Sequence, residues 1–138
     1  MKTPCGALVM IALVACKSPV DCSGSTPVSV LGSWNYAATQ NAPTTASLAG
    51  ALSITGQCGN TFTGTLDVTE TDAQGSRRRS GTVSGRAVDS GTVTFDVFLT
   101  TVGRQHLGSV ARDSMRGTWV EPNDVASASG SFLAVKSP

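Results

Sequence analysis

The stretch TFTGTLDVTE, residues 61 to 70, alternates between small polar and large apolar side chains. Successive side chains of an extended strand point to opposite faces, so Phe62, Leu66 and Val68 fall on one side of the chain. The opposite side is mostly threonine, a β-branched residue that favours strands. The stretch therefore predicts a β-strand with one face against a core and the other in water.

Similar short runs occur on both sides of this stretch, and turn signals such as Asp89-Ser90-Gly91 separate them. No gap between the runs is long enough for a parallel crossover. The sequence predicts an all-β fold, an up-and-down antiparallel meander barrel of about eight strands, because closure removes exposed edges. The strands are expected at residues 32–39, 47–55, 61–70, 80–88, 92–100, 104–111, 115–120 and 130–136.

Glycine recurs inside these runs, in FTGTL, SGTVSG, SGTVTF and RGTWV. Glycine within a strand is tolerated where a sheet bends sharply or where a large side chain crosses above it, and a small barrel needs both. A phosphate-binding role would require a strand that leads into a helix, and that context is missing. These glycines are therefore interpreted as structural.

The composition limits the class of protein. A chain of 138 residues with 14% charged residues makes one domain, expected to be a monomer. Once Lys2 is removed with the N-terminal segment, nine basic residues balance nine acidic ones, from totals of ten and nine. Nucleic-acid binding needs a basic face, so nucleic acid is not an expected partner.

Residues 1–15 have the parts of a secretory signal: an early Lys2, an apolar core over residues 7–14 and the small Ala15. The apolar run is about half of the roughly 20 residues that a membrane-spanning helix needs. The alternative is a buried or interfacial N-terminal helix. The abrupt change to polar sequence at residues 17–19 argues against it.

The four residues Leu13-Val14-Ala15-Cys16 resemble the lipobox of bacterial lipoproteins. The resemblance implies cleavage after Ala15 and transfer of a diacylglycerol to the Cys16 thiol, so that acyl chains such as palmitate anchor the mature chain to a membrane. The expected location is the bacterial cell envelope. Lys17 after the lipidated position indicates the periplasmic face of the outer membrane rather than the inner membrane.

The same resemblance assigns the remaining cysteines. Cys5 would leave with the signal peptide and Cys16 would carry lipid, so Cys22 and Cys58 are left as an expected disulfide in an oxidising periplasm. Two unpaired surface thiols are the alternative. Residues 16–31 are expected to be the lipidated cysteine and a flexible tether, and residues 32–138 the barrel.

The predicted barrel resembles the calycins, the superfamily that includes lipocalins and avidins. Gly32-Ser33-Trp34 is similar to their G-x-W signature, which implies that Trp34 closes one end of the barrel, and residues 60–65 are similar to an avidin strand. Lipocalins usually have an arginine on the last strand over that tryptophan, and the candidate for this position here is Lys136. The chain has two tryptophans, fewer than avidins bring to biotin, so biotin binding is not expected. The domain is also similar to small bacterial lipoproteins with repeated G-T-V-x-G strands, which end in a G-x-F-x-A-x-K/R strand as residues 130–136 do.

The barrel interior is the main candidate site. An eight-stranded barrel is just wide enough to be filled by side chains or to hold one small ligand. The first hypothesis is a membrane-anchored binding module for a small apolar ligand or an envelope component. The alternative is a structural or interaction lipoprotein with a solid core, whose partner is an envelope protein. The residues expected to point inward are Trp34, Tyr36, Leu52, Ile54, Phe62, Leu66, Val83, Phe95, Val97, Met115, Trp119 and Phe132, with Trp34, Tyr36, Phe62, Phe95 and Trp119 as ligand contacts.

Catalytic chemistry finds little support. His106 is the only histidine, which excludes a His-cluster metal site, and it is expected at the surface or at a barrel mouth. No serine lies in a G-x-S-x-G context. The chain is therefore predicted not to be an enzyme, with no cofactor and no metal.

Two charged groups remain. Arg77, Arg78 and Arg79 are expected at a loop tip, where they would contact anions such as lipid phosphates, or would simply be solvated. The carboxylates Asp67, Glu70 and Asp72 are expected near one hairpin. They suggest calcium only weakly, because they lack the dense oxygen spacing of a calcium loop.

Overall fold

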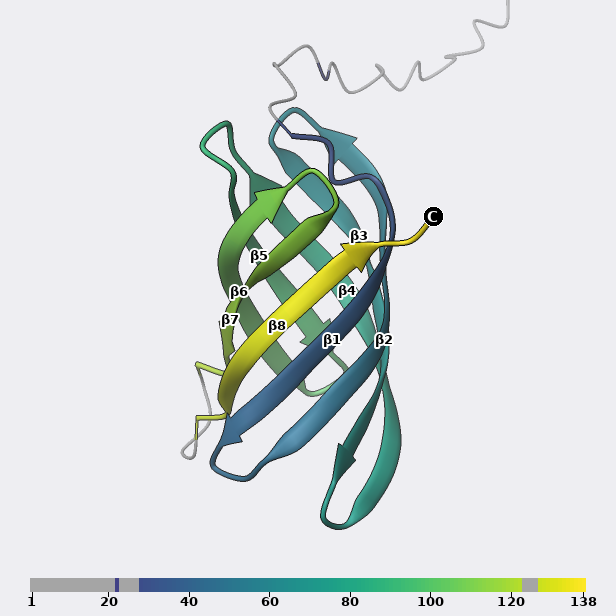
Figure 1. Ribbon diagram of the computed structural model, residues 1–138, viewed down its shortest axis with the longest axis vertical. Coiled ribbons are helices and arrows are strands. Elements are labelled where there is room, and N and C mark those ends of the chain that lie inside the picture. The colour runs from purple at the N-terminus through teal and green to yellow at the C-terminus, as the bar shows by residue number, and fades with distance from the viewer. Residues whose placement is uncertain (1–21, 23–27, 123–126) are drawn as a thin grey trace, which may run out of the picture.

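The computed structural model of this chain describes Cys22, residues 28–122 and residues 127–138. Its eight strands form one closed antiparallel barrel in which each strand pairs with the next and β1 pairs with β8 (Figure 1). The predicted fold class is confirmed. None of the described residues form a helix that is long and apolar enough to cross a membrane. The strands are β1 (Gly32–Ala42), β2 (Ala46–Cys58), β3 (Thr61–Asp72), β4 (Gly75–Ala87), β5 (Thr92–Leu99), β6 (Val102–Ala111), β7 (Ser114–Val120) and β8 (Ser129–Lys136).

The two-residue alternation sets the core. All twelve residues that were predicted to point inward are buried, and none is more than 4% exposed. In β3 the inward side chains Phe62, Leu66 and Val68 are continued by Glu70, which is also buried. The same alternation that places apolar side chains inside the barrel therefore also places a carboxylate inside it, near the Asp72 end of β3.

Strand β4 corrects the predicted boundaries. Residues 72–79 were expected to be a loop, but the turn consists of Ala73 and Gln74 alone, and β4 begins at Gly75. The Gln74 N–H donates to Asp72 Oδ1 at 2.8 Å, which tightens the turn. Gly75 has a φ of 128°, a conformation that glycine adopts easily. The arginine triplet thus lies within a strand and not at a loop tip.

The C-terminal part of the predicted tether also needs correction. Val30 is fully buried and Val28 packs against the core, so residues 28–31 lie on the barrel instead of forming a free linker. The side chain of Gln57 fixes them: its Oε1 accepts from the Val30 N–H at 2.9 Å and its Nε2 donates to the Val28 carbonyl at 2.8 Å. The predicted signal peptide, Cys16 and the rest of the tether except Cys22 lie outside the described residues.

Gly85 in β4 shows why glycine recurs within the strands. A Cβ atom at this position would lie 2.4 Å from Phe95 Cβ and 2.6 Å from Phe62 Cζ. Both distances are far shorter than a van der Waals contact, so only glycine lets these two rings cross β4. The structural interpretation of the glycine repeat holds at this position.

Candidate functional site

The barrel has two ends of different construction. The upper end in Figure 1 carries the β2–β3, β4–β5 and β6–β7 turns, and the lower end carries the β1–β2, β3–β4 and β5–β6 turns. At the upper end Trp34 is fully buried, and its Nε1 donates to the Val30 carbonyl at 2.9 Å. Lys136 Nζ lies 5.4 Å from the Trp34 ring centroid, so this lysine occupies the position that the lipocalin resemblance gave it. These residues close the upper end.

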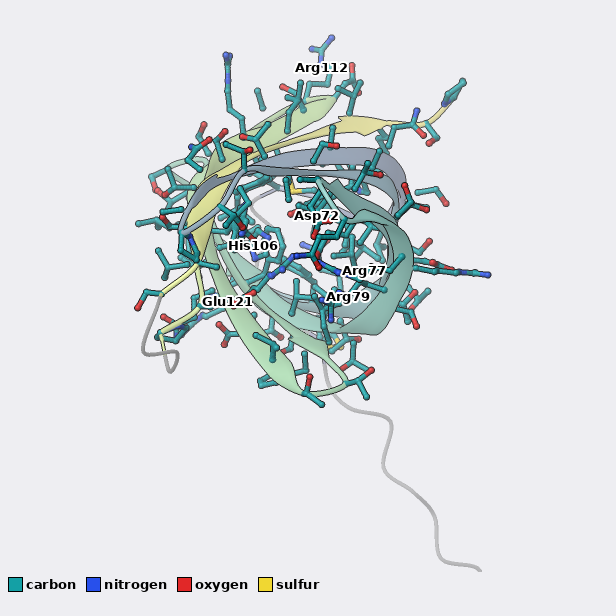
Figure 2. The ribbon with its side chains drawn as sticks, turned by 90° about the horizontal axis from the view of Figure 1, so that it is seen from below. Asp72, Arg77, Arg79, His106, Arg112 and Glu121 are labelled. Carbon is teal, nitrogen blue, oxygen red and sulfur yellow. A yellow bond between two sulfur atoms is a disulfide. The ribbon has the colours of Figure 1, made fainter. Side chains whose placement is uncertain are left out.

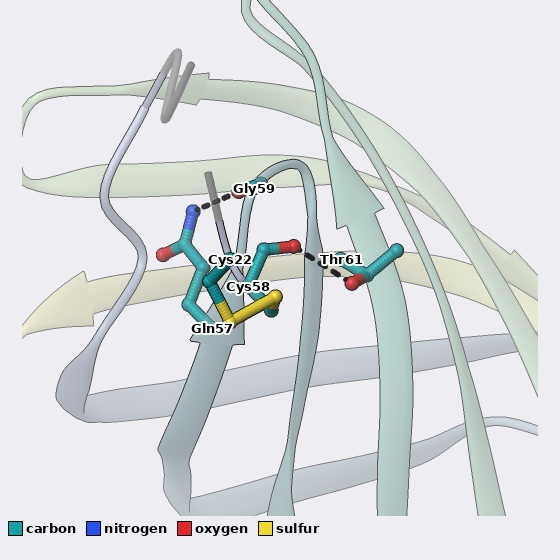
Figure 3. Close-up of a disulfide and its surroundings, with 5 residues drawn as sticks. All are labelled: Cys22, Gln57, Cys58, Gly59 and Thr61. Carbon is teal, nitrogen blue, oxygen red and sulfur yellow. Dashed lines mark hydrogen bonds between the residues drawn. A yellow bond between two sulfur atoms is a disulfide. The ribbon is translucent and has the colours of Figure 1, made fainter. Parts of the chain in front are cut away.

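A disulfide joins the chain before β1 to this upper end. Cys22 and Cys58 are bonded (Figure 3), and their Cα atoms are 4.9 Å apart. Cys58 ends β2, and its carbonyl accepts a hydrogen bond from Thr61 Oγ1 at 2.9 Å across the β2–β3 turn. The structure therefore has the predicted pair and not two free thiols.

The middle of the barrel is filled by rings from five strands. Phe95 stacks on His106 with a centroid distance of 4.3 Å, and Phe132 meets the same imidazole edge-on at 5.1 Å. Tyr36 stacks against Phe132 at 6.1 Å. The predicted ligand contacts Tyr36 and Phe95 thus pack against neighbouring side chains, as does Phe62, which lies 6.2 Å from Phe95.

His106 lies in this cluster, which corrects its predicted place at the surface or mouth. It is 3% exposed, and its Nε2 lies 2.9 Å from the Tyr36 hydroxyl. Burial lowers the pKa of His106 to about 3 and raises the pKa of Tyr36, so both groups are neutral at physiological pH. The misplacement has a simple cause: the apolar Leu107 beside it points outward and is 58% exposed.

Below the rings lies a buried ion pair that sequence reasoning missed. Arg104 Nε donates to Glu121 Oε1 at 2.7 Å, and both side chains are almost fully buried. The Arg104 guanidinium also stacks over Trp119, with Cζ 4.5 Å from the ring centroid. Arg104 lies two residues before His106, in the inward phase of β6. That phase is the signal in the sequence that indicates an inward Arg104, although a charge inside a small barrel is unusual.

Glu70 connects this pair to the arginine triplet. Its carboxylate lies 3.4 Å from Arg104 Nη2, 2.7 Å from Arg77 Nη2 and 3.2 Å from Arg79 Nε. The Arg79 Nε contact has the distance of an ion pair without the alignment of a hydrogen bond, while Arg79 Nη2 donates to Glu70 Oε1 at 3.5 Å. Arg77 also pairs with Asp72. Seen from below in Figure 2, the labelled members Glu121, Arg77, Arg79 and Asp72 lie around and across the lower end of the barrel.

The arginines hold these carboxylates in their charged form. Burial alone would raise the pKa of Glu70, but the hydrogen bond from Arg77 and the charges of Arg79 and Arg104 bring it below its ordinary value. The pKa of Asp72 is lowered by the Gln74 backbone N–H and by Arg77. We call Glu70, Asp72, Arg77, Arg79, Arg104 and Glu121 the lower charge network.

The predicted charged groups are therefore divided between the two faces of the sheet. Arg78 points outward and pairs with Asp67, so it is separated from Arg77 and Arg79. Asp67 is likewise separated from Glu70 and Asp72, which places the three carboxylates of the calcium hypothesis on different faces with arginine partners. Contact of the arginines with an external anion stays a prediction.

A cleft adjoins the lower charge network. It has a volume of about 570 Å³ and lies between the β1–β2 and β3–β4 turns. The cleft is lined by Thr44, Thr45, Asp72, Ala73, Gln74 and Arg77.

Deeper in the barrel, two buried nitrogen atoms, His106 Nδ1 and Trp119 Nε1, have no hydrogen-bond partner among the residues that the structure describes.

Comparisons with known proteins support the fold. The solved structure of EF1p2_mFAP2b bound to DFHBI is similar with a TM-score of 0.63 and 11% identity, covering 78% of this chain and 93% of that one. A de novo designed fluorescence-activating β-barrel has a TM-score of 0.54 and 11% identity, covering 77% and 93%. No protein-family model and no curated protein sequence matches the chain. At such identities the likeness shows a shared lipocalin-like barrel fold.

Proposed function

We propose that this chain is a lipid-anchored protein of the bacterial cell envelope whose lipocalin-like barrel binds a small ligand at its lower end. The observation that carries the binding part is the difference between the two ends. The upper end is closed by Trp34, Val30 and the disulfide, whereas the lower end has a cleft beside buried charges. Buried charges are costly to keep in a core, and they are often retained for function.

The cleft is a better place for a ligand than the barrel centre. Rings occupy the centre, whereas the cleft volume of about 570 Å³ lies within the range of small-molecule sites. Thr44, Thr45 and Gln74 supply hydrogen-bonding groups, and Arg77 supplies a positive charge. A small molecule with an apolar body and a polar or anionic group suits this lining. The purely apolar ligand in the barrel interior stays a prediction of the sequence.

The ligand site is tested with the fluorescent probe anilinonaphthalene sulfonate, which has an apolar body and one anionic group. We expect saturable binding by the folded barrel and at least tenfold weaker binding by the variant Thr44→Trp, whose indole would fill the cleft. Thr118→Trp is the matched control, because Thr118 is also exposed but lies on the outer face of β7. Equal binding by both variants would place the probe elsewhere and remove the lower-end site.

The anchor rests on the lipobox-like residues Leu13-Val14-Ala15-Cys16. Mass spectrometry of the membrane fraction should show a mature chain that begins at Cys16 and carries acyl mass, and Cys16→Ser should abolish both. We place the protein at the periplasmic face of the outer membrane, which separation of the two membranes by density would check. An uncleaved chain without acyl mass would end the lipoprotein proposal.

A second candidate function is a structural or interaction lipoprotein with a solid barrel. The ring-filled centre around His106, Phe95 and Phe132 favours it. The probe titration separates the two candidates, because a solid barrel that serves only to contact an envelope protein gives no saturable signal at the cleft.

A further inference from the structure

We infer that the Cys22–Cys58 disulfide orients the barrel on the membrane, with the upper end held against the bilayer and the lower cleft facing away from it. The inference rests on the proposed lipidation of Cys16. The partner surface is the lipid bilayer that carries the anchor. Two lengths, that of the tether and that of the barrel, determine the orientation.

The disulfide shortens the tether by about half. Five residues separate Cys16 from Cys22, so the bonded Cys22 lies within about 20 Å of the lipidated residue even when the chain is fully extended. Without the bond, the first residue after Cys22 that the structure describes on the barrel is Val28, and a chain from Cys16 to that residue reaches about 40 Å.

The height of the barrel lies between these two lengths. Strand β3 runs from Thr61, beside Cys58, to Asp72 at the lower end. Twelve residues at about 3.3 Å each, tilted by roughly 40°, give about 30 Å along the barrel axis. A barrel placed with its lower end on the bilayer would raise Cys22 to about 30 Å above the surface, which a tether of about 20 Å cannot reach. The unbonded tether of about 40 Å allows both orientations.

The upper end also carries side chains that suit a lipid surface. Leu31 is 42% exposed beside the start of β1, and Arg112 is exposed in the β6–β7 turn. An apolar side chain and a cation are the groups that contact acyl chains and lipid phosphates. Ser90, in the β4–β5 turn, shares this end, whereas Gln74 marks the tip of the β3–β4 hairpin at the other end.

This orientation narrows the ligand class. With the upper end on the bilayer, the cleft beside Arg77 opens to the aqueous phase at about a barrel height from the lipid. The ligand therefore arrives as a water-soluble molecule, and is not extracted from the membrane that holds the anchor.

The test measures energy transfer from the mature acylated chain to a rhodamine-labelled headgroup in vesicles of phosphatidylethanolamine and phosphatidylglycerol. A fluorescent non-natural amino acid replaces either Ser90 at the upper end or Gln74 at the lower end, which leaves the cysteines untouched. We expect several-fold stronger transfer from position 90 than from position 74. Equal transfer from the two positions would overturn the orientation.

Two further variants test whether the short disulfide-bonded tether causes the orientation. Ten Gly/Ser residues inserted between Lys17 and Ser18 keep the disulfide but add about 35 Å of reach. The insertion and the pair Cys22→Ser with Cys58→Ser should both reduce the difference between the labels, and near-ultraviolet circular dichroism checks that each barrel is folded. An unchanged difference in the folded insertion variant would overturn the inference.

The outcome also separates the inference from the proposed function. A chain that lacks acyl mass and does not float with the vesicles contradicts the lipid anchor itself. A chain that is acylated and floats but transfers energy equally from both labels keeps the anchor and contradicts only the orientation.

Discussion

At the scale of single residues, the surroundings of His106 show how apolar the barrel interior is. Its imidazole is packed between Phe95 and Phe132 and hydrogen-bonded to Tyr36. A protonated imidazole at this position would be charged in an apolar environment without a carboxylate among these contacts, which explains the low pKa. The His106 imidazole therefore stays neutral in the folded barrel at pH values where it is protonated in the unfolded chain.

This difference predicts a loss of stability in mild acid. The pKa of His106 is about 3 in the folded barrel and about 6.5 in the unfolded chain. Its contribution is present above pH 6.5 and is lost as the pH falls towards 3, by up to about 1.4 kcal/mol per pH unit. Urea unfolding at a series of pH values should show this slope. The variant His106→Gln should be flatter between pH 6.5 and 5, and a variant with the wild-type slope would contradict the assignment.

At the acidic end of this range the carboxylates should add to the loss of stability. The pKa values of Glu70 and Asp72 are lowered in the folded barrel, so their contributions are present above the ordinary carboxylate pKa and disappear as the pH falls through the lowered values. The two contributions therefore overlap in strong acid, whereas the loss between pH 6.5 and 5 depends on His106 alone.

At the scale of elements, the β3–β4 hairpin carries two kinds of ion pair on its two faces. Glu70 and Arg77 are paired within the lower charge network on the inner face, whereas Asp67 and Arg78 are paired in solvent on the outer face. Ion pairs in water contribute little, but removing one partner of a buried pair leaves an uncompensated charge. The same hairpin therefore provides a matched comparison.

Replacing Glu70 should cost far more than replacing Asp67. We expect Glu70→Gln to lower the free energy of unfolding by about 2–3 kcal/mol, because Arg77, Arg79 and Arg104 share this buried carboxylate and Arg104 keeps only Glu121. Asp67→Asn should change it by at most about 1 kcal/mol. Chemical denaturation of both variants measures the difference. Similar values for the two would show that the inner face is solvated and that the network does not depend on Glu70.

The elements also show how far the sequence could be interpreted. Alternation located all eight strands and the apolar core, because one face of each strand must be buried. It failed at the start of β4, where three consecutive arginines suggested solvent. Arg77 and Arg79 pair with the buried Glu70 because the register places Arg77 opposite Glu70. This register cannot be predicted from the sequence of one strand alone. Arg104 and Glu121 were missed for the same reason. Each charge can be buried only when the other is its partner, and the sequence of one strand does not show which residue outside that strand lies next to it.

At the scale of the whole molecule, the disulfide links the chain that precedes the barrel to the β2–β3 turn. Its removal should lower the free energy of unfolding by roughly 3–4 kcal/mol, because Cys22 and Cys58 close a long loop that would otherwise be free in the unfolded chain. Urea unfolding of the variant with both cysteines changed to serine tests this. Reduced wild-type protein should coincide with the variant, and an unchanged midpoint in both would show that the bond does not stabilise the barrel.

The pairing of β1 with β8 has a consequence for how the molecule forms. Trp34 lies opposite Lys136, so the contact that completes the barrel joins residues at the two ends of the domain sequence. Contacts so distant in sequence give a high contact order, and proteins of this kind fold slowly. During synthesis β1 has one partner, β2, and keeps an exposed edge until β8 has been made. A nascent chain of this protein is therefore an open sheet prone to pair with other edges, and it becomes a barrel only when its last eight-residue strand is complete.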